Sequence, residues 1–124
     1  MNKIILSGNI VKANELVNGV VKNSIAVKRD FKNQKGEYET DFFDIVAFNN
    51  CATYMSNYIG KGDKVELSGR MQIKTYQSQD GVNRKFYEVV IESISVLTKS
   101  MSSLANQEEP EDLEPINDED DLPF

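Results

Sequence analysis

Apolar and polar residues alternate along five stretches of the chain, with the period of two that is typical of β-strands. The alternating stretches are Lys3 to Val11, Val20 to Arg29, Tyr38 to Phe48, Lys64 to Tyr76 and Arg84 to Leu97. Gly8 interrupts the first stretch, and a glycine inside a strand marks a bulge or a close approach of another backbone. The pattern therefore predicts five β-strands in one domain.

One segment has a helical spacing instead. Apolar residues at i, i+3 and i+7 from Ala52 predict a short helix between the third and fourth strands. We expect Asn49 or Asn50 to cap its start and a left-handed Gly60 to end it. Three strands, a short helix and two more strands predict an all-β fold, a five-stranded, partly open oligonucleotide-binding (OB) barrel. Another small β-barrel or a sandwich is the alternative.

Alternation also predicts which side chains form the core. On the third strand, Phe43, Ile45 and Ala47 share the inward face. Because Asp44 carries a charge that is costly to bury unpaired, its face should meet solvent. That outward face also holds Thr40, Phe42, Val46 and Phe48. On the other strands the inward residues are Val21, Ile25, Val27, Val65, Leu67, Met71, Ile73, Tyr87, Val89 and Ile91.

The charge is divided unequally along the 124 residues. Residues 1–105 hold all 14 Lys and Arg and 11 Asp and Glu, whereas residues 106–124 hold 9 acids and no base. A mildly basic body fits a domain that binds polyanions, and the acidic end fits an interaction tail or a purely solubilising one. We predict a domain at 1–98 and a disordered acidic tail at 99–124, which contains all three prolines.

Other classes of protein receive little support. There is no histidine, no metal-ligand cluster and no phosphate-binding loop, so we expect no enzyme, cofactor or metal. Cys51 is the only cysteine and no apolar run has transmembrane length. We therefore expect a cytoplasmic protein without membrane contact.

Aromatic rings and cations recur where the pattern predicts solvent. Single-stranded nucleic acid is held by cations along a groove and by rings on which bases stack. The candidate rings are Phe31, Phe42, Phe48 and Tyr76, and the candidate cations are Lys28, Arg29, Lys32, Lys35, Arg70, Lys74, Arg84 and Lys85. The alternative is that the rings pack under loops or in a subunit interface. Isolated cations such as Lys12 and Lys22 are better explained as solvated charges.

Several pieces of the chain together resemble bacterial and phage single-stranded-DNA-binding proteins. The matching pieces are Met1 to Asn9, Phe31 to Glu37, Thr40 to Phe48, Tyr58 to Asp63, Leu67 to Arg70, Tyr76 to Gly81 and Asp120 to Phe124. The resemblance implies an OB fold that wraps single-stranded DNA, usually as a homotetramer, with a dimer as the alternative. It also implies stacking roles for Phe31, Phe42, Phe48 and Tyr76. Three of these positions are tryptophan in many members, so the rings here are smaller.

The resemblance extends to the acidic terminus. It implies that Asp120, Asp121, Leu122, Pro123 and Phe124 recruit replication, recombination and repair proteins, although the linker before them lacks the usual Gly/Gln-rich stretch. The predicted function is sequence-independent binding and protection of single-stranded DNA. An RNA-binding barrel of the cold-shock or anticodon-binding kind and a pure protein-interaction barrel are the alternatives.

Overall fold

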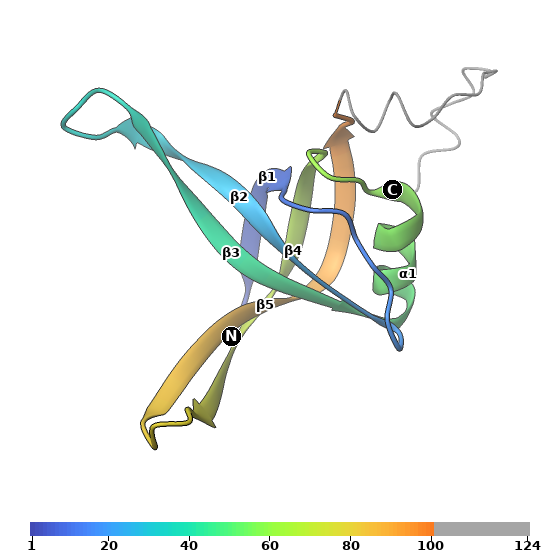
Figure 1. Cartoon of the computed structure of the whole chain (residues 1–124). Helices are drawn as coiled ribbons and strands as arrows, with labels where there is room; N and C mark the ends of the chain where they lie inside the picture. The colour runs from blue at the N-terminus through green and yellow to red at the C-terminus, as the bar shows by residue number, and fades with distance from the viewer. Residues whose placement is uncertain (101–124) are drawn as a thin grey trace.

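The computed structural model describes residues 1–100 and contains the predicted order of three strands, one helix and two strands (Figure 1). The elements are β1 (Ile4–Ile10), β2 (Val20–Lys32), β3 (Tyr38–Phe48), α1 (Asn49–Tyr58), β4 (Lys64–Gln77) and β5 (Asn83–Thr98). Within these 100 residues, no helix is long and apolar enough to cross a membrane. The predicted tail residues from 101 onward, including Asp120 to Phe124, lie outside the described residues.

The five strands form a closed barrel in the order β1-β2-β3-β5-β4. β1 closes it, because it pairs antiparallel with β4 from Ile4 to Asn9 and then with β2 at Asn9 and Ile10. Gly8 makes this crossing possible: a Cβ at Gly8 would lie 2.2 Å from the Ala26 carbonyl oxygen. The predicted close backbone approach at Gly8 is confirmed.

The barrel interior is filled by the inward residues of the strands and by one face of α1. The buried cluster contains Ile10, Val21, Ile25, Ile45, Ala47, Ala52, Met55, Ile59, Val65, Leu67, Val89, Ile91 and Ile94. Ala52, Met55 and Ile59 are the three helical positions that the spacing predicted to share a face. The alternation therefore predicted most of the core correctly.

For three residues the predicted burial is wrong. Ile73 and Tyr87 are 56% and 54% exposed, although the pattern placed them in the core. They pair with each other where β4 and β5 have left the barrel, so no second layer covers them. Val46, predicted to face solvent, is 2% exposed, because Lys22 of β2 and Val90 of β5 flank it in the sheet.

Both predicted helix caps are also wrong. The N-cap position is Phe48 and no side-chain hydrogen bond caps it, because β3 runs directly into α1. The C-cap is Ile59 in an extended conformation, and Gly60 is not among the residues with positive φ. The Gly60 N–H instead donates to Asp63 Oδ2 at 2.8 Å. A buried carboxylate thus takes the place of a left-handed turn.

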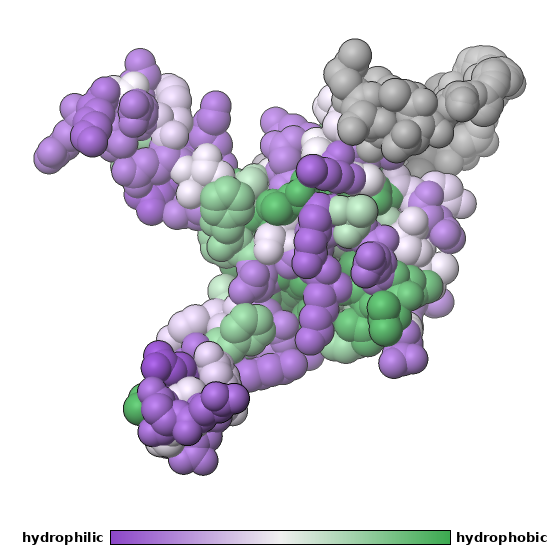
Figure 2. Space-filling view, in the orientation of Figure 1, coloured by the Kyte–Doolittle hydropathy of each residue, from purple (hydrophilic) through white to green (hydrophobic). Residues whose placement is uncertain are grey.

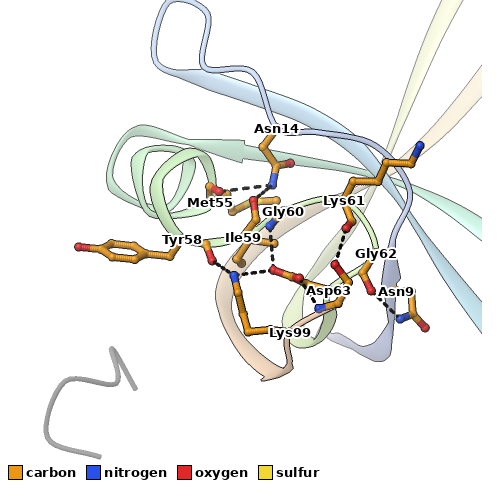
Figure 3. A network of polar contacts seen from close by, with 11 residues as sticks. Asn9, Asn14, Met55, Tyr58, Ile59, Gly60, Lys61, Gly62, Asp63 and Lys99 are labelled. Carbon is orange, nitrogen blue, oxygen red and sulfur yellow. Dashed lines mark hydrogen bonds and ion pairs between the residues drawn. The ribbon is translucent and has the colours of Figure 1, made fainter. Parts of the chain in front are cut away.

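Asp63 joins the end of β5 to the loop between α1 and β4 (Figure 3). Its side chain is fully buried, and Oδ2 lies 2.8 Å from Lys99 Nζ. Ser100 N–H donates to Oδ1 at 2.9 Å, and Lys99 Nζ also donates to the Tyr58 carbonyl oxygen. Lys99 and Ser100, which the sequence placed beyond the domain, are therefore bonded to the barrel.

Two hairpins extend past the barrel as arms, one from β2 and β3 and one from β4 and β5 (Figure 1). β3 and β5 pair in parallel only at Ile45–Val89 and Val46–Val90. Beyond these pairs the two hairpins diverge. The outer parts of both arms are mainly hydrophilic, whereas apolar side chains gather near the bases of the arms (Figure 2).

Candidate nucleic-acid interface

The outward side chains of β2, β3, β5 and β4 form one continuous surface, which we call the outer face. Strand pairing places Lys22, Val46, Val90 and Arg70 in one row across it. Phe42 and Phe48 belong to the same face, because they lie four residues before and two residues after Val46 on β3. Both rings are exposed, and Phe42 is 66% exposed.

Tyr76 reaches the same face from β4. It pairs with Arg84, and Lys74 beside it pairs with Phe86 of β5. Arg70, Lys74 and Tyr76 alternate along β4, so their side chains point to the same side of the β4–β5 hairpin. The outer face therefore continues along this arm to the ring of Tyr76. The structure therefore brings Phe42, Phe48 and Tyr76 onto one surface, whereas the alternation predicted only that each ring points outward.

A groove opens where β3 and β5 separate. Its volume is about 420 Å³, and its lining includes Phe42, Asp44, Lys85, Phe86 and Tyr87. Lys85 was a predicted site residue, whereas Phe86 was missed. The available signal was the period of two, which puts Phe86 on the face of Arg84 and opposite Lys74.

A buried carboxylate lies in the middle of the outer face. Glu88 is 3% exposed, accepts a hydrogen bond from Gln72 Nε2 at 2.9 Å and forms an ion pair with Lys74 Nζ at 3.0 Å. Burial raises the pKa of Glu88, but hydrogen bonds from Gln72 and Lys74 and the charges of Lys74 and Lys22 outweigh it, so its pKa lies below the usual 4.5. Glu88 is therefore ionised at neutral pH and offsets the charge of Lys74.

Arg29 is held by two carboxylates. Its guanidinium contacts both Asp41 oxygens at 2.9 Å and Glu39 Oε1 at 2.8 Å. The hydrogen bond from Arg29 lowers the pKa of Asp41, and the same contact raises the pKa of Arg29. Arg29 is thus less available to a phosphate than its charge suggests.

Phe31 lies on the first arm but on its other face. Lys32 pairs with Tyr38, so the pleat turns the neighbouring Phe31 to the side opposite Tyr38. The ring is exposed. Phe31 therefore does not share the outer face with Phe42, and a strand that contacted both rings would have to pass around the arm.

The remaining predicted cations differ in their pairing. Arg84 lies 3.7 Å from Asp80, whereas Lys28, Lys32, Lys35, Arg70 and Lys85 form no ion pair among residues 1–100. Lys12 and Lys22, which the sequence analysis explained as solvated charges, both line a concavity of about 690 Å³ beside Val20. Val20 pairs with Phe48, so this concavity adjoins the outer face.

Known proteins are similar to this chain in sequence and in fold. Single-stranded DNA-binding protein 1 of Streptococcus pyogenes is 32% identical over all of this chain and 99% of its own length. The small single-stranded DNA-binding protein from Streptomyces coelicolor has a similar fold, with a TM-score of 0.61 and 24% identity over 77% of this chain and 95% of that protein. The Plasmodium falciparum SSB, solved in complex with ssDNA, has a TM-score of 0.67 and 21% identity over 78% of this chain and 95% of its own.

The family model for the single-strand binding protein family matches residues 1–97, which include every described strand and the helix except the last residue of β5. The OB fold and the resemblance inferred from the sequence are confirmed. The chain belongs to the single-strand binding protein family.

Proposed function

We propose that this protein binds single-stranded DNA without choosing a sequence and protects it during replication, recombination and repair. The observation that carries the proposal is the set of exposed rings on one outer face, Phe42, Phe48 and Tyr76, with Arg70 and Lys85 near them. Every base has a face that can stack on a ring, so this arrangement favours affinity over sequence recognition. We infer a binding role without catalysis.

The test is binding of labelled oligo(dT) at several salt concentrations. Affinity should fall as salt rises, with a log–log slope of roughly −0.7 per phosphate neutralised. Phe42→Ala should weaken binding by about 1–3 kcal/mol and leave thermal unfolding nearly unchanged, because its ring is exposed. Binding that ignores salt and survives Phe42→Ala would reject this interface.

RNA is the competing ligand for a barrel of this kind. A competition between oligo(dT) and oligo(U) of equal length separates the two functions. We expect DNA to displace RNA at lower concentration. Preference for oligo(U) would indicate that RNA is the ligand. If neither oligonucleotide bound, a protein-interaction role would be favoured.

We further propose that the chain assembles as a homo-oligomer, in the first place a tetramer. β1 supports this, because Ile5 is exposed on its outward face while Leu6 packs against the core. A large exposed apolar residue on a short strand favours a subunit contact. A monomeric mass by light scattering in dilute buffer would contradict it.

The acidic end is proposed to recruit partner proteins. Asp120, Asp121, Leu122, Pro123 and Phe124 combine negative charge with apolar side chains, which together suit a basic surface with an apolar pocket. Deleting residues 106–124 should abolish capture of replication and repair proteins while DNA affinity stays equal or rises slightly at low salt. Unchanged capture would make the tail a solubilising end.

A further inference from the structure

The arm formed by β2 and β3 carries an aromatic ring that the sequence did not single out. Tyr38 is 46% exposed, and Lys28 Nζ and Lys32 Nζ lie 5.4 and 5.8 Å from the centre of its ring. Lys32 pairs with Tyr38 and Lys28 pairs with Thr40, so the ring and both cations share one face of the arm.

That face is the continuation of the outer face. Tyr38, Thr40 and Phe42 alternate along β3, so Tyr38 lies about 13 Å beyond Phe42 on the same side. A concavity of about 490 Å³ beside them extends from Ala26, which pairs with Phe42, to Tyr38. A strand that leaves Phe42 along the arm would therefore meet Tyr38.

The two faces of the arm differ in available charge. Arg29, which also borders this concavity, is neutralised by Glu39 and Asp41, which lie on the opposite face of β3. On the Tyr38 face, Lys28, Lys32 and Lys64, which also lines the concavity, form no ion pair within residues 1–100. Asp30 is the one carboxylate in the lining, so the face keeps a net positive charge.

We propose that Tyr38 is a further stacking platform for single-stranded DNA, with Lys28 and Lys32 binding the phosphates on either side of the stacked base. The inference rests on the proposed function, and it extends the DNA path from Phe42 onto the first arm. A base stacked on the ring contributes more than a cation–π contact at an exposed site. A base can therefore replace the two lysine ammonium groups over the ring, and the lysines can then contact the phosphates of the DNA backbone.

The test compares Tyr38→Ala with Tyr38→Phe in the full chain, using oligo(dT) of increasing length. Tyr38→Ala should weaken binding of the longer oligonucleotides about tenfold, and Tyr38→Phe, which keeps the ring, should stay within about twofold of the wild type. The matched control is Tyr58→Ala, because Tyr58 is an exposed tyrosine on α1, away from the outer face. It should bind as the wild type does.

A spectroscopic signal tests stacking directly. The chain has no tryptophan and five tyrosines, so its intrinsic fluorescence reports on tyrosine. Tyr38→Phe should lose part of the quenching that oligo(dT) causes, whereas Tyr58→Phe should not. The cations are tested by Lys28→Gln with Lys32→Gln, which should reduce the salt slope by about 0.7 for each lysine, against Lys61→Gln as the control.

The outcomes separate the two proposals. If Tyr38→Ala binds oligo(dT) like the wild type while Phe42→Ala is weakened, the Tyr38 platform is rejected and DNA binding stands. If Tyr38→Phe loses as much affinity as Tyr38→Ala, the hydroxyl is responsible and stacking is rejected. If the wild type binds no oligo(dT), the proposed function itself fails.

Discussion

Replacing Glu88 by glutamine should strengthen binding of single-stranded DNA. The carboxylate lies on the outer face and forms a 3.0 Å ion pair with Lys74, and its lowered pKa keeps it charged at neutral pH. Glu88→Gln removes this negative charge and releases Lys74 for a phosphate. Because the amide oxygen of glutamine can still accept the hydrogen bond from Gln72, the fold should be retained.

The expected size follows from the number of charges released. Each phosphate neutralised on a single strand adds about 0.7 to the steepness of the log–log salt dependence. If Lys74 gains one phosphate contact, the slope of the Glu88→Gln variant becomes steeper by about 0.7. A fourfold reduction in salt should then increase its advantage over the wild type by a factor of about 2.6.

The assay is fluorescence anisotropy of labelled oligo(dT) across a salt series, with Glu92→Gln as the matched control. Glu92 lies on the same strand and also forms a 3.0 Å ion pair, but its partner is Lys3, which is not among the candidate site residues. Glu92→Gln should change affinity little. Equal slopes for Glu88→Gln and the wild type, or an equal gain from Glu92→Gln, would refute the argument that the position of the released charge matters.

Three further predictions concern stability and assembly. Asp63→Ala should cost about 3 kcal/mol in urea unfolding, because it removes a fully buried carboxylate and leaves Lys99 without this partner; a loss below about 1 kcal/mol would contradict this. The lowered pKa of Glu88 means that its contribution to stability is present above pH 4.5 and is lost as pH falls through the lowered pKa, so Glu88→Gln should flatten the acid side of the stability profile; superimposable profiles would count against it. Ile5→Lys should give a smaller assembly by light scattering, and an unchanged mass would remove β1 from the interface.

The strands were predictable because one face of each strand is buried, which makes apolar and polar residues alternate with a period of two. The same period could not show where the barrel ends. Ile73 and Tyr87 have the correct phase for the core, yet they lie on an arm with no second layer to cover them. Alternation therefore predicts the side of a strand on which a residue lies, while burial depends on what packs against that side.

The helix ends failed for a different reason. Capping rules assume that a helix begins and ends in a turn with local hydrogen bonds. Here β3 passes directly into α1, and the carboxylate that accepts the Gly60 N–H is that of Asp63, which is held in turn by Lys99 just after β5. A contact between positions 63 and 99 leaves no local signal in the sequence.

For the interface, the sequence identified the rings better than the cations. The position of Phe42, Phe48 and Tyr76 in the alternation is enough to predict that their rings are exposed, because each ring only has to point outward. The face of Phe31 was less predictable, since the pairing of β2 with β3 is irregular between Lys28 and Lys32. An irregular register changes the partner of every residue beyond it. Tyr38 was missed although the period of two along β3 already places it on the face of Thr40 and Phe42.

The availability of a cation depends on register even more strongly. Lys74 and Arg29 have the same formal charge as Arg70 and Lys28, but cross-strand pairing places carboxylates beside the first two only. Neutralised cations already have an anion in contact, so binding a phosphate requires them to exchange one partner for another, with little net release of counterions. The salt dependence of DNA binding should therefore count the unpaired cations of the outer face and the first arm, and removing an unpaired lysine such as Lys28 should change the slope more than removing Arg29.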